Sequence, residues 1–392
     1  MQLSNKPKKS ANQLAKTMSL LSTQVLAMPA IAADQPIDNE LGYRYSRYLE
    51  DSLPGTDVLN GSTDRYDISI HQFRFSAPLG GRFSLVVDAS RENMSGASPM
   101  ATIRGPDDKP LLLMTGATIE DTRDDLKVAA SWWADQATIS ASLYRSEEDD
   151  YRSIGGSLGV EWSVNDDLTS FSTSFSAYND ELFPSDAEEF GRIEFASKQR
   201  RSLHLGLSQV MSAERVLNLG LGYTQLDGFL SDPYKDVDVR PDSNGQFTAT
   251  AKLRQFVRKA NAAVHADYRY YNDDFGVRSH TLESRWHQML GSRWQLVPYV
   301  RLYSQSAADF YKGYDFEQPD LTSPQSSDFR LSSYGALSAG VRVTATWDRW
   351  NFKVTAQRYR SDASWGLGSS VVSPALVDFN LFTIGLDTYF GD

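Results

Sequence analysis

Apolar and polar residues alternate with a period of two along most of this chain. In the stretch Ala336–Tyr359, Leu337 and Val343 fall on one face, and Arg342 falls on the other. Successive side chains of a strand point to opposite faces, whereas a helix repeats near 3.6 residues. The alternation stops at Asp348-Arg349 and then resumes. The pattern therefore predicts a β-hairpin here.

About sixteen segments of this kind follow one another, among them residues 83–89, 137–143, 154–164 and 217–223. Most are longer than the roughly five or six residues that are usual for strands of globular proteins. Their length suits a tilted membrane strand of roughly 9 to 11 residues. Antiparallel sandwiches of soluble proteins also alternate in this way, so the alternation alone leaves that alternative open.

The connections between the segments alternate in length, which favours a membrane barrel. Short ones lie at residues 78–81, 134–136, 165–167, 212–215, 258–260, 290–293 and 348–349. Long polar ones lie between them, at residues 91–121, 179–197, 227–245, 306–327 and 361–376. Outer-membrane barrels have short periplasmic turns, long extracellular loops and an even number of strands. We predict an all-β fold, an antiparallel up-and-down transmembrane β-barrel of about sixteen strands.

Tryptophan gathers near the short connections, and tyrosine gathers at the other ends of the segments. Amphipathic aromatic rings prefer the boundary between water and hydrocarbon, so a barrel carries two aromatic girdles. The predicted periplasmic girdle consists of Trp132, Trp162, Trp286, Trp294, Trp347 and Trp350.

The first residues have the order of a secretory signal peptide. Four lysines precede a modest apolar stretch, and Ala30-Ile31-Ala32 offers a cleavage site made of small residues. We predict a signal peptide over residues 1–32 and a single outer-membrane barrel domain over residues 33–392; a short amphipathic helix is the alternative for the N-terminus. Mean hydropathy is -0.43. Outside the N-terminus, no apolar run approaches the roughly 18 residues that a helical span needs.

Composition narrows the chemistry. The chain has no cysteine, which excludes disulfides, thiol ligands and a thiol nucleophile. The formal charge is -11, and it becomes -15 once the predicted signal peptide with its four lysines is removed, so nucleic acid is an unsuitable partner. The five histidines show no metal-binding spacing. His280 and Ser284 share a face, but that face is expected to look at lipid. We predict no catalytic residue, no metal, no cofactor and no enzymatic activity.

Charged residues of both signs cluster at mid-strand on neighbouring segments. Because a charged side chain that faces lipid is energetically costly, these residues are expected to line the interior of the barrel. The pore-lining candidates are Lys252, Arg254, His265, Asp267, Arg269, Glu283, Arg285, His287, Arg301 and Arg342. Register matching, to within about two residues, predicts that Lys252, His265, Glu283 and Arg301 form one row across four strands. The row is either a constriction or binding site in a pore, or an ion-pair network that fills and stiffens the lumen.

Three predicted loops are acidic, at residues 146–153, 179–190 and 236–242. They could bridge lipopolysaccharide through divalent cations or steer cations inward. The simpler interpretation is that their charge only keeps the loops solvated.

Several stretches resemble the proteobacterial domain-of-unknown-function family 3570. They lie at residues 86–99, 121–125, 227–235 and 270–283, and SDPYK and DDFGVRSHT are the most specific. The resemblance covers nearly the whole mature chain and implies an outer-membrane barrel. It also implies, by association, a role beside a thioredoxin-like protein, a small lipoprotein and a flavin transferase. Its use of Ser231, Asp232, Pro233 and Tyr234 implies a structured outer loop, with an inward fold as one option.

Taken together, these features predict a porin-like channel for a small polar or ionic solute in the outer membrane of a Gram-negative bacterium. A non-conducting barrel scaffold for an extracytoplasmic flavin- or thioredoxin-linked redox system is the first alternative, and an outer-membrane lipid hydrolase is the second. Expected partners are outer-membrane lipid and lipopolysaccharide, the barrel-assembly machinery, and a periplasmic redox partner or small lipoprotein.

Overall fold

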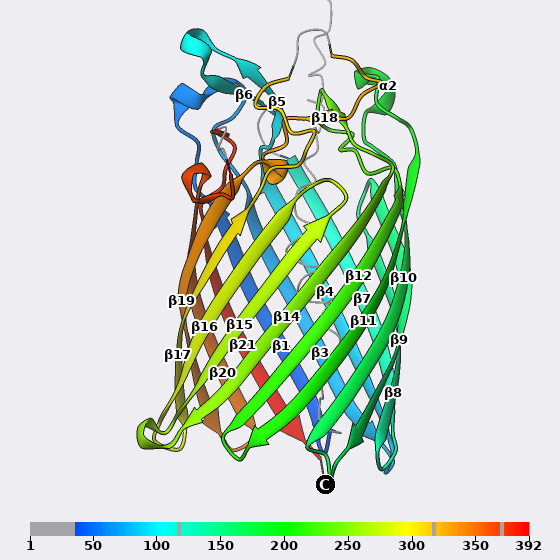
Figure 1. Ribbon diagram of the computed structural model, residues 1–392, viewed down its shortest axis with the longest axis vertical. Coiled ribbons are helices and arrows are strands. Elements are labelled where there is room, and N and C mark those ends of the chain that lie inside the picture. Colours follow the sequence, from blue (N-terminus) through cyan, green and yellow to red (C-terminus); the bar gives the residue numbers. More distant parts are fainter. Residues whose placement is uncertain (1–35, 116–118, 316–318, 369–371, 392) are drawn as a thin grey trace, which may run out of the picture.

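Sixteen antiparallel strands close into one barrel in the computed structural model, which describes residues 36–115, 119–315, 319–368 and 372–391 (Figure 1). The first strand pairs with the last over twelve residues, from Asn39 opposite Phe390 to Glu50 opposite Phe379. The prediction of an up-and-down barrel of about sixteen strands is confirmed. The predicted signal peptide lies outside the described residues.

The strands of the barrel follow one another around the wall in sequence order. They are β1 (Asn39–Glu50), β3 (Asp67–Leu79), β4 (Phe83–Gly96), β7 (Ile119–Trp133), β8 (Ala137–Glu147), β9 (Tyr151–Val164), β10 (Thr169–Leu182), β11 (Ala196–Ser212), β12 (Arg215–Gly228), β14 (Ser243–Val257), β15 (Ala262–Asp273), β16 (Arg278–Leu290), β17 (Trp294–Gln305), β19 (Tyr334–Trp347), β20 (Trp350–Asp362) and β21 (Phe379–Phe390). Among the described residues, no helix is both long and apolar enough to cross a membrane.

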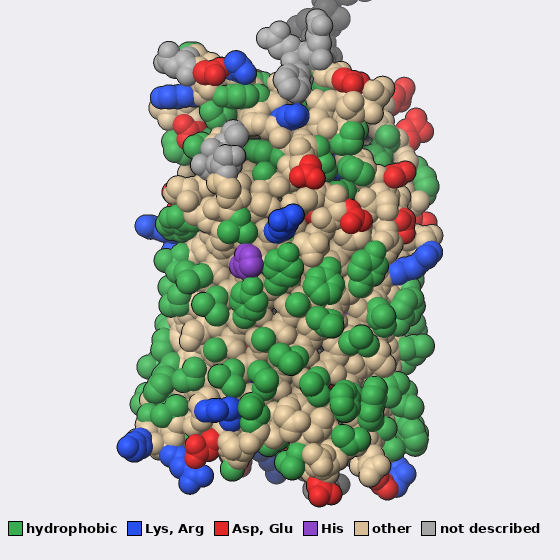
Figure 2. Space-filling model, viewed as in Figure 1, with side chains coloured by type: hydrophobic (Ala, Val, Ile, Leu, Met, Phe, Trp, Pro, Cys, Tyr) green, Lys and Arg blue, Asp and Glu red, His purple; other side chains and the backbone are tan. Residues whose placement is uncertain are grey.

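The outer surface of the wall is apolar. Leu143, Ile154 and Leu158 are 64 to 74% exposed, although they lie at mid-strand. Figure 2 shows such side chains forming a band across the visible face of the barrel, with charged groups above and below it. In a soluble protein this surface would have to be covered, whereas in a bilayer it faces hydrocarbon. The alternating apolar positions of the sequence are therefore the lipid-facing ones.

One end of the barrel, here called the turn end, carries seven short connections. Several of them contain Asn or Asp in the left-handed region, for example Asn165 (φ 62°), Asn261 (φ 46°) and Asp348 (φ 47°). Asn and Asp tolerate this conformation better than other non-glycine residues do, which explains why these types end the alternation. Both ends of the described chain also lie at the turn end, since Asn39 pairs with Phe390.

The opposite end, called the loop end, carries the long connections (Figure 1). One predicted acidic loop is shorter than expected. Ser146 still pairs with Ser153 in the sheet, so that only residues 148–150 connect β8 to β9. The acidic stretch at residues 146–153 is therefore mainly strand.

Most of the secondary structure outside the barrel lies in three loops, which connect β1 to β3, β4 to β7, and β17 to β19. In the described residues the small elements are η1 (Gly55–Asp57), β2 (Val58–Asn60), β5 (Pro99–Arg104), η2 (Pro106–Asp108), β6 (Pro110–Met114), α2 (Ala187–Phe190), β13 (Asp238–Val239), η3 (Arg258–Ala260), β18 (Gln325–Ser326), η4 (Phe329–Leu331) and η5 (Ala363–Trp365). Strands β2, β6 and β5 form one small sheet, and β13 pairs with β18. All of them except η3 belong to the loop end.

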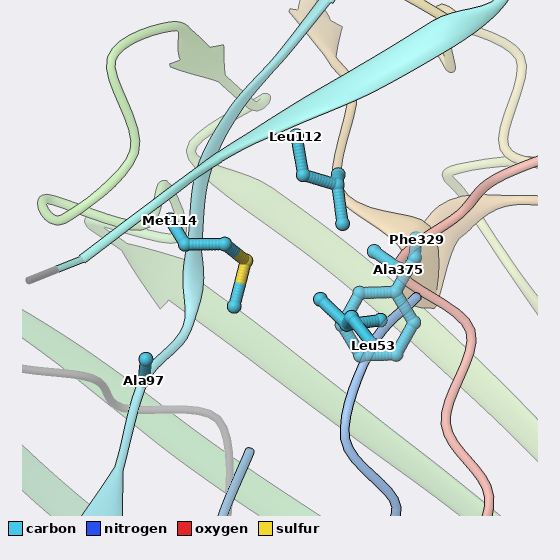
Figure 3. Packing of buried hydrophobic residues seen from close by; sticks show 6 residues of the cluster. All are labelled: Leu53, Ala97, Leu112, Met114, Phe329 and Ala375. Atoms are coloured by element: carbon cyan, nitrogen blue, oxygen red, sulfur yellow. The ribbon is translucent and has the colours of Figure 1, made fainter. Parts of the chain in front are cut away.

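A compact apolar cluster holds four of the loops together. Leu112 and Met114 of β6 pack with Leu53, Phe329 and Ala375, which come from three other loops (Figure 3). Leu112 is fully buried and Met114 nearly so. Burying such side chains contributes about 1.5–3 kcal/mol each. The loop end thus has a hydrophobic core of its own, whereas the barrel wall below it turns its apolar side chains outward.

Candidate functional site

The structure places all ten pore-lining candidates on the inward face of neighbouring strands. On β15 and β16 they alternate with Tyr268, Leu282 and Trp286, which are exposed on the outer surface. Each of the ten is half-buried, so part of each side chain remains accessible to water. Five adjacent strands, β14 to β17 and β19, supply them. Together they form a charged sector of the inner wall.

The predicted row across the charged sector holds to within two residues, and His265 is the member that is displaced. Lys252 pairs with Asp267, Asp267 pairs with Glu283, and Glu283 pairs with Arg301. His265 instead lies in the adjacent row, between Arg254 and Arg285. The two-residue shift arises because the turn over residues 258–261 includes η3, whose length the alternation does not reveal. The inward face of His265 is unchanged, since a shift of two residues keeps the same face.

Only part of the charged sector is neutralised by ion pairs. Arg254 binds the Asp267 carboxylate with both terminal nitrogens, and Arg285 contacts Glu283 at 2.6 Å. Within the described part of the chain, Lys252, Arg269, Arg301 and Arg342 have no carboxylate within 4.0 Å. The sector is therefore a mixture of two ion pairs and several cations without a close counter-charge.

Two histidine rings contact each other at a tilt of 35° within this sector. The ring centroids of His265 and His287 lie 4.0 Å apart. The charged groups that act on His287 are Arg342, Arg285 and Arg254, all of them cationic. Such surroundings repel a metal cation. The pair adds aromatic surface and nitrogen atoms to a positively charged wall.

The wall next to the charged sector carries many small polar residues. On the inward faces of β8 to β12, hydroxyl groups pair across strands, as in Ser142 with Ser157 at 2.8 Å and Ser202 with Thr224 at 2.9 Å. Gly220 and Gly206 lie on the same wall, where their missing side chains leave space near Ser172 and Thr250. One sector of the lumen is therefore densely charged, and its neighbour is lined mainly by hydroxyl groups, with Glu161, Lys198 and Arg200 among its inward residues.

Three loops meet above the mouth of the barrel, and we call them the roof. The roof consists of the described residues of the β4–β7 loop (97–118), the β12–β14 loop (229–242) and the β17–β19 loop (306–333). These loops start from separate points of the rim, because two strands lie between the second and third loops and four lie between the first and second. Loops that arise so far apart can meet only over the opening.

Backbone contacts tie the roof together. Asp236 N donates to Met100 O at 3.0 Å, and Asp315 N donates to Thr102 O at 2.7 Å. The Asp315 carboxylate in turn accepts from Thr102 N at 2.8 Å. The β4–β7 loop is therefore bonded to both of the other two loops.

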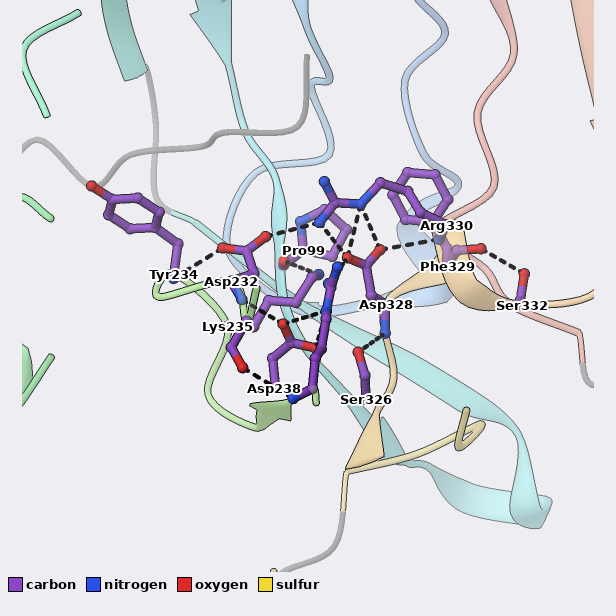
Figure 4. A network of polar contacts seen from close by, with 12 residues as sticks. Pro99, Asp232, Tyr234, Lys235, Asp238, Ser326, Asp328, Phe329, Arg330 and Ser332 are labelled. Atoms are coloured by element: carbon purple, nitrogen blue, oxygen red, sulfur yellow. Dashed lines mark hydrogen bonds and ion pairs between the residues drawn. The ribbon is translucent and has the colours of Figure 1, made fainter. Parts of the chain in front are cut away.

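Ion pairs bury charge inside the roof, as Figure 4 shows. Arg330 donates to Asp328 at 2.8 and 2.9 Å and to Asp232 at 2.9 Å. Arg240 forms an ion pair with Asp328 at 2.8 Å and another with Asp238 at 2.9 Å. Asp328 is fully buried. A buried carboxylate shared by two guanidinium groups fixes the relative position of the two loops that supply them.

The electrostatics of the roof differ from one carboxylate to the next. Burial opposes the charge on Asp328, but Arg330, Lys235 and Arg240 outweigh it and hold the pKa of this carboxyl well below its usual range. Burial dominates at Asp238 and raises the pKa of its carboxyl despite Arg240. Burial likewise raises the pKa of Asp315. Asp328 therefore stays ionised at neutral pH and anchors the network.

The sequence pattern predicts parts of the roof and misses others. The expected structured loop at Ser231 to Tyr234 is present and folds inward, since Asp232 belongs to the ion-pair network and Tyr234 is buried. Residues 236–242 were expected to be solvated, but Asp238 and Arg240 lie inside the roof, so this expectation is wrong. Asp328 and Arg330 carry no sequence signal, because they lie in an irregular segment without periodicity.

An acidic cluster lies beside the roof. Asp121, Glu148 and Asp150 each bring a carboxylate oxygen within 4.8 Å of the others, and Asp121 and Asp150 are buried. Asp150 accepts a hydrogen bond from the Tyr234 hydroxyl. Burial raises the pKa of Tyr234 to about 12, so its phenol acts as a neutral donor. Tyr234 thus connects this cluster to the roof.

All six predicted girdle tryptophans lie on the outer face, near the turn end. Each of them is between 37 and 45% exposed. Trp294 and Trp347 meet edge to face, with ring centroids 5.5 Å apart, and Trp347 also contacts Phe352. The geometry suits an interfacial belt, whose contact with lipid stays a prediction. His280 also faces outward, where it bonds with the Tyr268 hydroxyl at 2.7 Å.

The closed antiparallel wall with an apolar exterior and a polar interior defines the class of outer-membrane β-barrels. The sequence profile of the family described as "Protein of unknown function (DUF3570)" matches residues 13–382, so the chain belongs to this family. The resemblance inferred from the sequence is thereby confirmed. Among curated proteins, none matches the chain.

Solved outer-membrane barrels share the fold. A structure described as "Bacterial polysaccharide outer membrane secretin" has a TM-score of 0.51 at 10% identity, with 90% of this chain and 98% of that chain covered. CdiB from Acinetobacter baumannii has a TM-score of 0.50 at 7% identity, with 91% of this chain and 60% of that chain covered. At such low identity the likeness concerns the fold alone.

Proposed function

We propose that this protein is an outer-membrane channel for small polar or ionic solutes, and that the roof controls access to it. The observation that carries the proposal is the half-exposed state of the ten charged-sector residues. Charged side chains that filled a solid core would be buried and paired, as Asp328 is in the roof. Those at mid-barrel keep contact with water, which supports a hydrated lumen.

The test is a planar-bilayer recording of the purified full-length protein. We expect discrete conductance steps that change when the row is neutralised in the triple variant Lys252→Gln, Glu283→Gln and Arg301→Gln. Arg82→Gln is a matched control, because Arg82 lies in an exposed turn and pairs only with the exposed Asp135. Conductance equal in the triple variant and the wild type would remove the row from the conduction path. Absence of conductance, also after removal of the roof loops, would overturn the channel.

Placement in the outer membrane has a separate test. Heat-modifiable migration on gels together with outer-membrane fractionation is the expected behaviour of a closed barrel in this compartment. Recovery in the soluble fraction would contradict it. The same fractions show whether lipopolysaccharide remains bound to the barrel.

The roof is the observation that favours a second candidate, a barrel that acts as a scaffold without an open pore. Its loops meet over the mouth and bury an ion-pair network there. In this case the partner is an extracytoplasmic redox protein or a small lipoprotein, as the family resemblance implies. Co-purification of such a partner from native membranes in mild detergent would support the scaffold. Purification of the barrel alone, together with conductance, would exclude it.

A further inference from the structure

The charged sector carries an excess of positive charge. Its inward faces hold six basic side chains: Lys252, Arg254, Arg269, Arg285, Arg301 and Arg342. The same faces hold three carboxylates, those of Asp267, Asp273 and Glu283. The formal charge of the whole chain is -11, so the sector has the opposite sign to the protein as a whole. The sector is therefore positively charged within a chain that is acidic as a whole.

The three carboxylates already have partners. Asp267 binds Arg254, and Glu283 binds Arg285. Asp273 lies at the loop end, where it accepts hydrogen bonds from Phe275 N, Val277 N and the Tyr271 hydroxyl. None of them neutralises Arg342, Arg301, Arg269 or Lys252 by direct contact.

The excess of positive charge is greatest around Arg342. The charged groups acting on its guanidinium are Arg285 and Arg44, both positive. Its Nε atom is buried, and among the described residues it has no hydrogen-bond partner. The same is true of the neighbouring His287 Nε2 atom. A buried polar atom without a partner is unfavourable, and more so when its group is charged, so the site favours a ligand that supplies acceptors.

We propose that Arg342, Arg285 and His287 form a binding site for an oxyanion group, a carboxylate or a phosphate, and that the channel consequently takes small anions. The selectivity part of this inference rests on the proposed channel function, whereas the binding part does not. Guanidinium groups present a planar fork of donors that matches the oxygens of carboxylate and phosphate. An anion here accepts from the buried nitrogens and removes the repulsion between neighbouring cations.

The other basic residues extend the path. Arg269 is within electrostatic range of Arg301, nearer the loop end. Lys252 is within range of the carboxylates of Asp267 and Glu283 as well as of Arg254 and Arg285. Basic side chains thus follow one side of the lumen from beneath the roof to Arg342. Aligned charges of one sign raise the local concentration of the oppositely charged solute. The adjacent wall consists mainly of serine, threonine and glycine, and its carboxylate Glu161 lies on β9, four strands away from β14 around the wall.

The first measurement uses the full-length protein in planar bilayers under a potassium chloride gradient. We expect a reversal potential on the chloride side, and a shift toward zero in Arg342→Gln. Arg342→Lys keeps the charge and retains most of the anion preference. Arg360→Gln, at an exposed position of the outer face, is the matched control and leaves the potential unchanged. A preference of the wild type for cations, or a reversal potential in Arg342→Gln equal to that of the wild type, overturns the proposal that the channel takes anions.

The second measurement needs no conductance. Thermal unfolding of the detergent-solubilised protein is followed with inorganic phosphate or with succinate, at constant ionic strength made up with chloride. An upward shift of the midpoint that disappears in Arg342→Gln and Arg285→Gln supports the site. Heat-modifiable migration of both variants shows that they fold. Comparison of phosphate with succinate shows whether the site prefers a phosphate or a carboxylate group. If the shift appears without any conductance, the channel fails and the site stands. If the protein conducts but shows neither a shift of the thermal midpoint nor a preference for anions, the binding site fails and the channel stands.

Discussion

Arg240 and Asp328 form a 2.8 Å ion pair above the mouth of the barrel, although 88 positions separate them in the sequence. Arg240 comes from the β12–β14 loop and Asp328 from the β17–β19 loop. Because Asp328 is fully buried and also binds Arg330, the carboxylate joins two loops that the barrel wall alone would leave independent.

Asp328→Asn is expected to loosen the roof. The variant leaves Arg240 and Arg330 partly buried without their shared anion, and breaking such a pair costs about 3–5 kcal/mol. Protease cleavage within residues 306–333 should become faster, and single-channel conductance should rise, while heat-modifiable migration stays intact. Unchanged cleavage in Asp328→Asn would show that the apolar cluster alone holds the roof. Arg82→Gln serves as the control, since an exposed pair contributes only about 0–1 kcal/mol.

Stability of the roof is expected to peak in mildly acidic solution. The pKa values of Asp236, Asp238 and Asp315 are raised by burial, so these groups destabilise the roof when ionised, and their protonation stabilises it as the pH falls toward 3.8. The pKa of Asp328 is lowered, so its contribution is present above 3.8 and is lost as the pH falls further. Hydrogen exchange of residues 229–242, corrected for intrinsic rates, should be slowest near pH 4. A monotonic rise in protection up to pH 8 would contradict this.

Gly155→Val should disturb the wall of the barrel. A Cβ at this position meets the Tyr178 ring at 2.2 Å and Ala177 O at 2.5 Å, so larger side chains cannot be accommodated without movement. Overpacking of this kind costs about 1–3 kcal/mol. Urea unfolding in lipid vesicles measures the loss. Gly55→Ala is the control, because its Cβ would have no atom within 4 Å; an equal loss in both variants would refute the packing argument.

A matched pair of substitutions tests which face meets lipid. Val354 points outward and is 53% exposed, whereas Thr355 on the same strand points inward. Val354→Arg should reduce the free energy of unfolding in vesicles by about 2–4 kcal/mol, the cost of a charge in the bilayer centre. Thr355→Arg should cost far less. Equal losses for the two variants would mean that the outer surface is not embedded in lipid.

The sequence predicts the barrel well because its signals are local. Alternation fixes which residues face outward, as at Leu337 and Leu282, and the asymmetry of connection lengths fixes which end carries the loops. Register is harder: the row that includes Lys252 and Glu283 is shifted at His265, since η3 changes the length of one turn. The faces nevertheless remain correct, because the error is an even number of residues.

The roof could not be predicted, because its contacts join distant and irregular segments. Lys235 Nζ donates to Pro99 O at 3.1 Å across 136 positions, and Thr102 meets Asp315 across 213. No period links such pairs, so a single sequence contains no rule that brings them together. The acidic segment at residues 236–242 reads as solvent-exposed for the same reason, although Asp238 is buried by its partners.

The pairing of β1 with β21 sets an order for biogenesis. One edge of β1 pairs with β3, but the other edge finds its partner only in residues 379–390, so this edge stays open until the last strand has been made and delivered. An open edge of this kind can pair with other chains. Between export and insertion, the chain therefore depends on chaperones that shield both edges of the sheet. A premature stop before Phe379 would leave a sheet that cannot close into a barrel.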